Sequence, residues 1–186
     1  MIFHSIRNSS NIKDRKKKKI YRRYLTNIFG KVTGKIFKET LNEKNDLRDK
    51  IYRSIGYHSF NMYAFALLKD QFSGHSLWES DLLSHAVDYI LTSDYKNDLE
   101  GNIYGYPYNC PGFEIPYALN IFGNLDNDNL VNISNLWINE QFRRCYNKET
   151  KMMDRNTSDP LTLTARTYEL CRLPINILDK INIETF

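Results

Sequence analysis

A continuous apolar stripe runs through residues 46–70, whose sequence is DLRDKIYRSIGYHSFNMYAFALLKD. The stripe consists of Leu47, Ile51, Ile55, His58, Met62 and Phe65. Their spacings of 4, 4, 3, 4 and 3 residues match one face of a helix with 3.6 residues per turn. Residues 46–70 are therefore predicted to form an amphipathic helix.

The same periodicity predicts helices before and after this one. Their approximate ranges are residues 13–29, 76–91, 113–122, 129–146 and 160–173. In the helix of residues 113–122, Pro116 is tolerated because it is expected in the first turn. Asp159-Pro160 indicates an N-cap followed by proline at the first helical position. Strand signals are nearly absent, so the predicted class is all-α. After Pro174 we expect an irregular tail or a fragment of one more helix.

Composition bounds the class of protein. The chain has 186 residues, of which 41% are hydrophobic, and this predicts one globular domain. Its three cysteines lack the spacing of a zinc site or a disulfide framework. No apolar run reaches the roughly 20 residues of a membrane span, and the first residues do not read as a signal peptide. We therefore expect a cytoplasmic protein without a metal site. Motifs for nucleotide cofactors are also missing, so no cofactor is expected.

Charge divides the chain into two parts. Residues 1–38 hold 12 of the 26 Lys and Arg against one acid, Asp14, and so carry +11, whereas residues 39–186 carry −7. We treat these as a basic N-terminal segment, partly helical or disordered, and a helical domain. The basic segment is either a solvated terminus or a site for phosphates of nucleic acid or an anionic membrane, reached through residues 13–38.

A stretch of about twenty residues, 92–113, has no sustained period, and loops this long are often functional. Its end, YGYPYNCPGFE at residues 104–114, concentrates aromatic rings, prolines and glycines beside a carboxylate. Tyr104, Tyr106 and Tyr108 offer flat apolar faces with polar tips, which suit a sugar. Glu114 is a candidate general acid or base if apolar walls raise its pKa. The alternative is a rigid aromatic cap in which Glu114 is only a first-turn acid.

The chain resembles part of an α/α toroid, the barrel of helical hairpins used by many carbohydrate enzymes. The resemblance rests on the alternation of helices and loops in residues 46–173, on the aromatic loop, and on the helix that starts at Asp159-Pro160 and carries Arg166 and Glu169. The resemblance implies antiparallel helical hairpins forming a partial toroid. A complete six-hairpin toroid needs about twice this many helices, so the resemblance implies half of one, which we assign to the C-terminal half.

Further candidates lie elsewhere on the predicted helices. His58 is either a proton carrier or a core histidine. Asp159 or Glu169 is a candidate second carboxylate for paired acid-base hydrolysis, and the alternative role of Asp159 is an N-cap. Arg166 is a candidate substrate orienter that could instead pair with Glu169. His75 and Trp78 are candidate sugar contacts. Cys110 is a weaker candidate nucleophile, because no histidine partner is evident in the sequence.

These patterns favour a carbohydrate-active enzyme domain that acts on a sugar or glycan by carboxylate or histidine acid-base chemistry, as a hydrolase, lyase or epimerase. The first alternative is a non-catalytic helical module whose basic segment binds nucleic acid or membrane phosphates. The second is a truncated gene product. Because half a toroid would expose an apolar flank, self-association or a missing partner segment is also expected.

Overall fold

The computed structural model describes residues 42–184, and these are helical with no β-strand, which confirms the all-α class. An isolated bridge joins Asn147 and Met152. None of the helices in this range combines the length and the apolar character needed to cross a membrane. The basic segment of residues 1–38, with its expected helix at 13–29, lies outside the described residues.

The helices follow one another along the chain, and the longest connections precede α7 and α9. In order they are α3 (Asn42–Gly56), α4 (His58–Gln71), the 3-10 helix η1 (Ser76–Glu79), α5 (Asp81–Ile90), α6 (Ser93–Leu99), α7 (Pro111–Phe122), α8 (Asn127–Cys145), α9 (Pro160–Ala165), the 3-10 helix η2 (Arg166–Arg172) and α10 (Ile175–Leu178).

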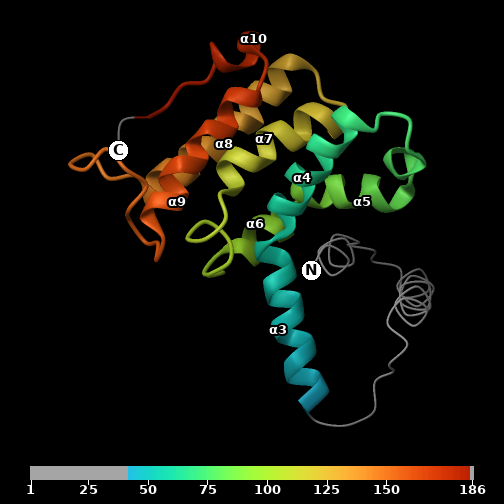
Figure 1. Ribbon diagram of the computed structural model, residues 1–186, viewed down its shortest axis with the longest axis horizontal. Helices are drawn as coiled ribbons and strands as arrows, with labels where there is room; N and C mark the ends of the chain where they lie inside the picture. Colours follow the sequence, from blue (N-terminus) through green and yellow to red (C-terminus); the bar gives the residue numbers. More distant parts are fainter. Residues whose placement is uncertain (1–41, 185–186) are drawn as a thin grey trace.

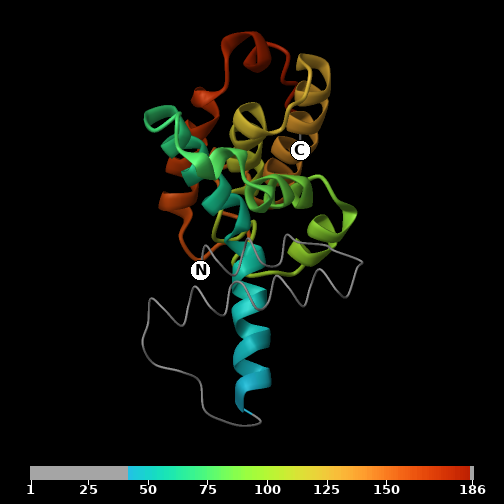
Figure 2. The same cartoon turned by 90° about the vertical axis from the view of Figure 1, so that its right-hand side faces the viewer.

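Helix α7 is the centre of the described body. It packs against α8, α4, η2 and α5, and residues 111–119 are all buried (Figure 1). A helix that is buried on all sides needs several neighbours to cover it, and only one of residues 111–119, Glu114, has a charged side chain. Helix α3 instead extends away from the described body in both views (Figure 2).

The single helix predicted for residues 46–70 is wrong at its middle, because the chain bends at Tyr57 between α3 and α4. Side-chain amides take the carbonyl oxygens there: Asn102 donates to the Tyr52 oxygen at 2.8 Å and Asn109 to the Gly56 oxygen at 3.0 Å. Gly56 is also required by close approach, since a Cβ on it would lie 2.4 Å from the Cβ of Tyr104.

Three other boundaries differ from the sequence predictions. The stretch 92–113 is not free of regular structure, because Thr92 caps α6 by accepting from the Tyr95 amide at 3.1 Å. Helix α7 begins at Pro111, so Pro116 lies past the first turn rather than within it. The regions 76–91 and 160–173 each divide into an α-helix and a 3-10 helix. After Pro174 the short helix α10 forms, as one of the two expected outcomes.

Candidate functional site

A buried group of polar side chains, here called the carboxylate cluster, joins α4, α7 and η2. Its members are Ser59, Cys110, Glu114, Arg166 and Glu169. Glu114 lies in the first turn of α7 and has no exposed surface. The hydroxyl of Ser59 donates to its Oε2 at 2.5 Å, and the Arg166 guanidinium donates to its Oε1.

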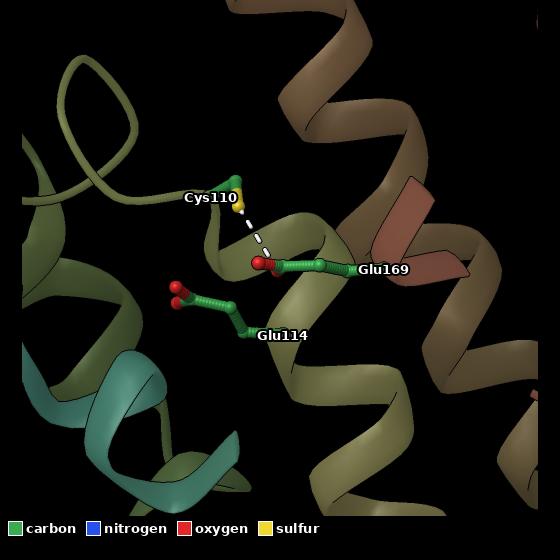
Figure 3. A group of neighbouring side chains, drawn as sticks. All are labelled: Cys110, Glu114 and Glu169. Carbon is green, nitrogen blue, oxygen red and sulfur yellow. Dashed lines mark hydrogen bonds between the residues drawn. The ribbon is translucent and has the colours of Figure 1, made fainter. Parts of the chain in front are cut away.

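Arg166 is the cation of the carboxylate cluster. Its Nε donates to Glu169 Oε1 at 2.9 Å, so one guanidinium binds two carboxylates. The thiol of Cys110 donates to Glu169 Oε2 at 3.3 Å. Figure 3 shows Cys110 at the start of α7, with Glu114 on the same helix and Glu169 reaching across from η2.

Metal-ligating atoms come together in the carboxylate cluster. The ligand atoms of Cys110, Glu114 and Glu169 lie within 4.8 Å of one another and all three residues are buried. The guanidinium of Arg166 donates to both carboxylates, so it offsets one of their two negative charges.

Burial sets the protonation of these groups. It raises the pKa of Glu114, against the opposing effects of Arg166 and Ser59. Burial also raises the pKa of the Cys110 thiol well above its usual range, and Glu114 adds to that shift. For Arg166 burial acts to lower the pKa, but Glu114 and the other neighbours raise it, so the guanidinium stays charged. Glu114 is thus the carboxyl group of the cluster whose protonated form burial favours, as a general acid requires.

An aromatic surface lies beside the carboxylate cluster and consists of Tyr57, Phe60, Tyr104 and Tyr108. The Tyr57 ring is 6.3 Å from Phe60, 5.7 Å from Tyr104 and 5.8 Å from Tyr108, measured between ring centroids. Phe60 and Tyr108 are 41% and 50% exposed, so the group faces solvent. The Arg166 guanidinium lies 5.4 Å from the Phe60 ring centre and thereby links the aromatic surface to Glu114.

The three tyrosines of the 104–114 loop do not act together. Tyr104 and Tyr108 share the aromatic surface, with centroids 6.2 Å apart. Tyr106 is only 6% exposed and lies over Trp137, and Arg144 covers its ring. Tyr106 is therefore a core residue in this structure rather than a part of the aromatic surface.

His58 is placed as the core histidine that the sequence left as one alternative. It has no exposed surface, its Nε2 lies 2.9 Å from the Ala86 oxygen, and its ring packs edge-on against Tyr89 and Tyr95. Burial lowers its pKa to about 4, so it is neutral at pH 7.

The remaining candidates lie apart from the carboxylate cluster. Asp159 is an exposed N-cap that accepts from the Thr162 amide at 3.2 Å. His75 caps η1 by accepting from the Leu77 amide at 3.1 Å. Trp78 packs against Phe65 and Phe122. Of the residues predicted for the site, the structure brings together Glu114 and Arg166, and beside them Tyr104 and Tyr108.

Sequence reasoning missed Ser59, Tyr57 and Phe60, which belong to the cluster or the aromatic surface. All three flank His58, and their helical spacing marks them only as residues beside the apolar stripe. The bend at Tyr57 turns them toward the 104–114 loop and η2, so the missing signal was a tertiary contact.

Comparison with known proteins gives one detailed similarity. The chain is 38% identical over 130 residues to archaeal glycosylation protein Q of Haloferax volcanii. The match covers 70% of this chain, but the chain spans only 33% of the length of that relative. No family model matches the sequence, and no solved structure matches it.

Proposed function

We propose that the chain is part of a carbohydrate-processing protein of glycosylation, with its sugar site at the aromatic surface and Glu114 as the acid-base group. The similarity to a protein named for archaeal glycosylation is the observation that carries the proposal. The chemistry of the site supports it independently. Exposed tyrosine and phenylalanine rings beside a buried carboxyl group are suited to a ligand with apolar C–H faces and a hydroxyl rim.

In this proposal the rings of Tyr57 and Tyr108 stack against the sugar, and Arg166 orients it. Glu114 is fully buried, so the proton transfer requires Phe60 and Arg166 to move aside when the ligand binds. Phe60 is 41% exposed, and rotamer changes of exposed side chains are fast, whereas a movement of Arg166, whose side chain is 13% exposed, also breaks its contact with Glu114. We further propose that the helical hairpins correspond to about half of an α/α toroid, with the remaining helices supplied by a further segment or a second copy.

The test is saturation-transfer NMR on the full chain with a panel of methyl glycosides that includes neutral, N-acetylated and acidic sugars. We expect transfer from aromatic protons to the C–H groups of at least one sugar. Tyr108→Ala should weaken its binding by about three- to tenfold, which is the contribution of one aromatic contact. Phe72→Ala is the matched control, because Phe72 is 62% exposed and terminates α4 at its far end.

A second variant separates binding from chemistry. Glu114→Gln keeps the shape of the side chain but cannot exchange a proton at that position, so it should retain sugar binding and abolish conversion of the bound glycoside, followed by NMR over time. Absence of transfer to every sugar, or transfer unaffected by Tyr57→Ala and Tyr108→Ala together, would overturn the proposal. Salt-sensitive binding to DNA or anionic vesicles in place of sugars would support the basic-segment alternative.

A further inference from the structure

The segment after α10 runs in an extended conformation along α8 (Figures 1 and 2). Two asparagines of α8 bind its main chain. Asn135 Oδ1 accepts from the Asn182 amide at 2.8 Å, and Asn139 Nδ2 donates to the Asn182 oxygen at 2.8 Å. Asn139 Oδ1 also accepts from the Glu184 amide at 2.9 Å. Residues 181–184 are thus held by main-chain recognition.

The spacing of these contacts follows from simple geometry. Asn135 and Asn139 are one i, i+4 step apart on α8, a rise of about 6 Å. Asn182 and Glu184 are two residues apart on an extended chain, a rise of about 6.7 Å. The two repeats nearly coincide, so a helix with side chains at i, i+4 and i+8 can bind every second residue of an extended peptide.

The next position of this repeat on α8 is Arg143. It lines a cavity of about 230 Å³ together with Asn139, Glu140 and Glu184, just past the last described contact of the segment. Its side chain is 57% exposed and pairs with Glu140 at 2.6 Å, which leaves several of its five N–H donors available.

We propose that Asn135, Asn139 and Arg143 form a recognition site for an extended peptide. The two asparagines bind the amide and carbonyl groups of the peptide, and Arg143 binds an oxygen acceptor of the peptide beside the position of Glu184. Within the chain the ligand is residues 181–184. Because the contacts are to main-chain atoms, the site tolerates changes of peptide side chains but requires free N–H groups at the positions of Asn182 and Glu184.

The experiment frees the site in the full chain. Asn182→Pro with Glu184→Pro removes two of the three hydrogen bonds between α8 and the segment, so the segment competes much more weakly. A fluorescent peptide with the sequence of residues 179–184 is then titrated and followed by anisotropy. We expect saturable binding to this variant and much weaker binding to the wild type, where the tethered segment competes at an effective concentration in the millimolar range.

Matched variants identify the contacts. Adding Asn139→Ala removes two hydrogen bonds and should weaken the peptide by about tenfold or more. Asn132→Ala, at an exposed asparagine of the same helix, should change it by less than about twofold. A peptide N-methylated at both the Asn182 and the Glu184 position should not bind, whereas N-methylation at the Ile183 position should be tolerated.

Absence of saturable binding to the folded proline variant, or equal binding by the Asn139→Ala variant or the doubly N-methylated peptide, would overturn the proposal. If the proline variant does not fold, hydrogen exchange of the Asn182 and Glu184 amides in the otherwise wild-type chain decides. Asn139→Ala should accelerate the exchange of the Glu184 amide, and Asn132→Ala should not. Unchanged exchange in Asn139→Ala would equally reject the site.

Discussion

Arg166→Met tests the carboxylate cluster directly, because it removes the cation and leaves Glu114 and Glu169 buried together. The side chains of Arg166, Glu114 and Glu169 are 13%, 0% and 4% exposed. Removing one partner of a buried ion pair costs about 3–5 kcal/mol, since the other charge remains without compensation. At about 2–4 °C per kcal/mol for a domain of this size, the melting temperature should fall by roughly 6–20 °C.

The assay is thermal and urea unfolding of the full chain, with Arg143→Met as the control. Arg143 also pairs with a glutamate, but its side chain is 57% exposed, so its loss should cost no more than about 1 kcal/mol. Adding Glu114→Gln to Arg166→Met should recover part of the lost stability, because it removes one of the two facing carboxylates.

The pH dependence of the destabilisation by Arg166→Met distinguishes a loss of charge from a loss of packing. The pKa of Glu114 is raised in the folded protein, so its carboxyl group favours folding below its usual pKa and loses that contribution as the pH rises. Without Arg166 the shift should be larger. The destabilisation by Arg166→Met is therefore expected to be smaller at pH 5 than at pH 8. A loss below 1 kcal/mol, or the same loss at both pH values, would refute the buried charge arrangement.

Three further predictions concern single residues. Gly112→Ala should lower the melting temperature, because the added Cβ would lie 2.3 Å from the Gln141 Cβ at the contact of α7 with α8. The expected cost in unfolding free energy is about 1–3 kcal/mol. An unchanged melting temperature would mean that the two helices separate easily. Burial lowers the pKa of His58 to about 4, so its contribution to stability is complete above about pH 6.5 and falls by up to about 3 kcal/mol as the pH drops toward 4. His58→Gln should flatten this part of the profile of urea stability against pH. An unaltered slope would contradict the burial of the ring. Exposed Cys171 should react with a thiol reagent in the native protein, whereas buried Cys110 and Cys145 should react only when the protein unfolds. Mass spectrometry counts the modified cysteines. Rapid modification of Cys110 would show that the carboxylate cluster opens.

The helices were predictable from the sequence where one face is apolar and the caps are local. The spacing around Trp137 located α8 to within two residues at each end, and Asp159-Pro160 marked the start of α9 correctly. The bend at Tyr57 was not predictable, because its cause is the amide of Asn109, which is 53 residues from Gly56. The spacing of apolar residues along one helix contains no information about a side chain, distant in the sequence, that donates a hydrogen bond to a carbonyl oxygen of that helix.

The site was predictable only in part for the same reason. Glu114 and Arg166 were identified by residue type near an aromatic loop and a helix start, yet their contact spans 52 residues. The neighbouring tyrosines illustrate the limit. Tyr104, Tyr106 and Tyr108 alternate in a loop, so the two outer rings face one way and Tyr106 the other, toward Trp137. Composition identified the loop as aromatic, but only the packing of α8 determined which ring is buried.

Helix α7 also explains why charges are placed in a core where apolar side chains would cost less. Buried ion pairs are often no more stabilising than hydrophobic residues of the same volume, so stability alone does not account for the cluster. Apart from Glu114, the buried residues 111–119 of α7 carry no charged side chain, so apolar packing by itself gives η2 and α4 little directional preference on this helix. The contacts of Glu114 with Ser59 and Arg166 are directional, and they specify one register. The same contacts place Phe60 against Arg166, so the position of the aromatic surface follows from the buried charges.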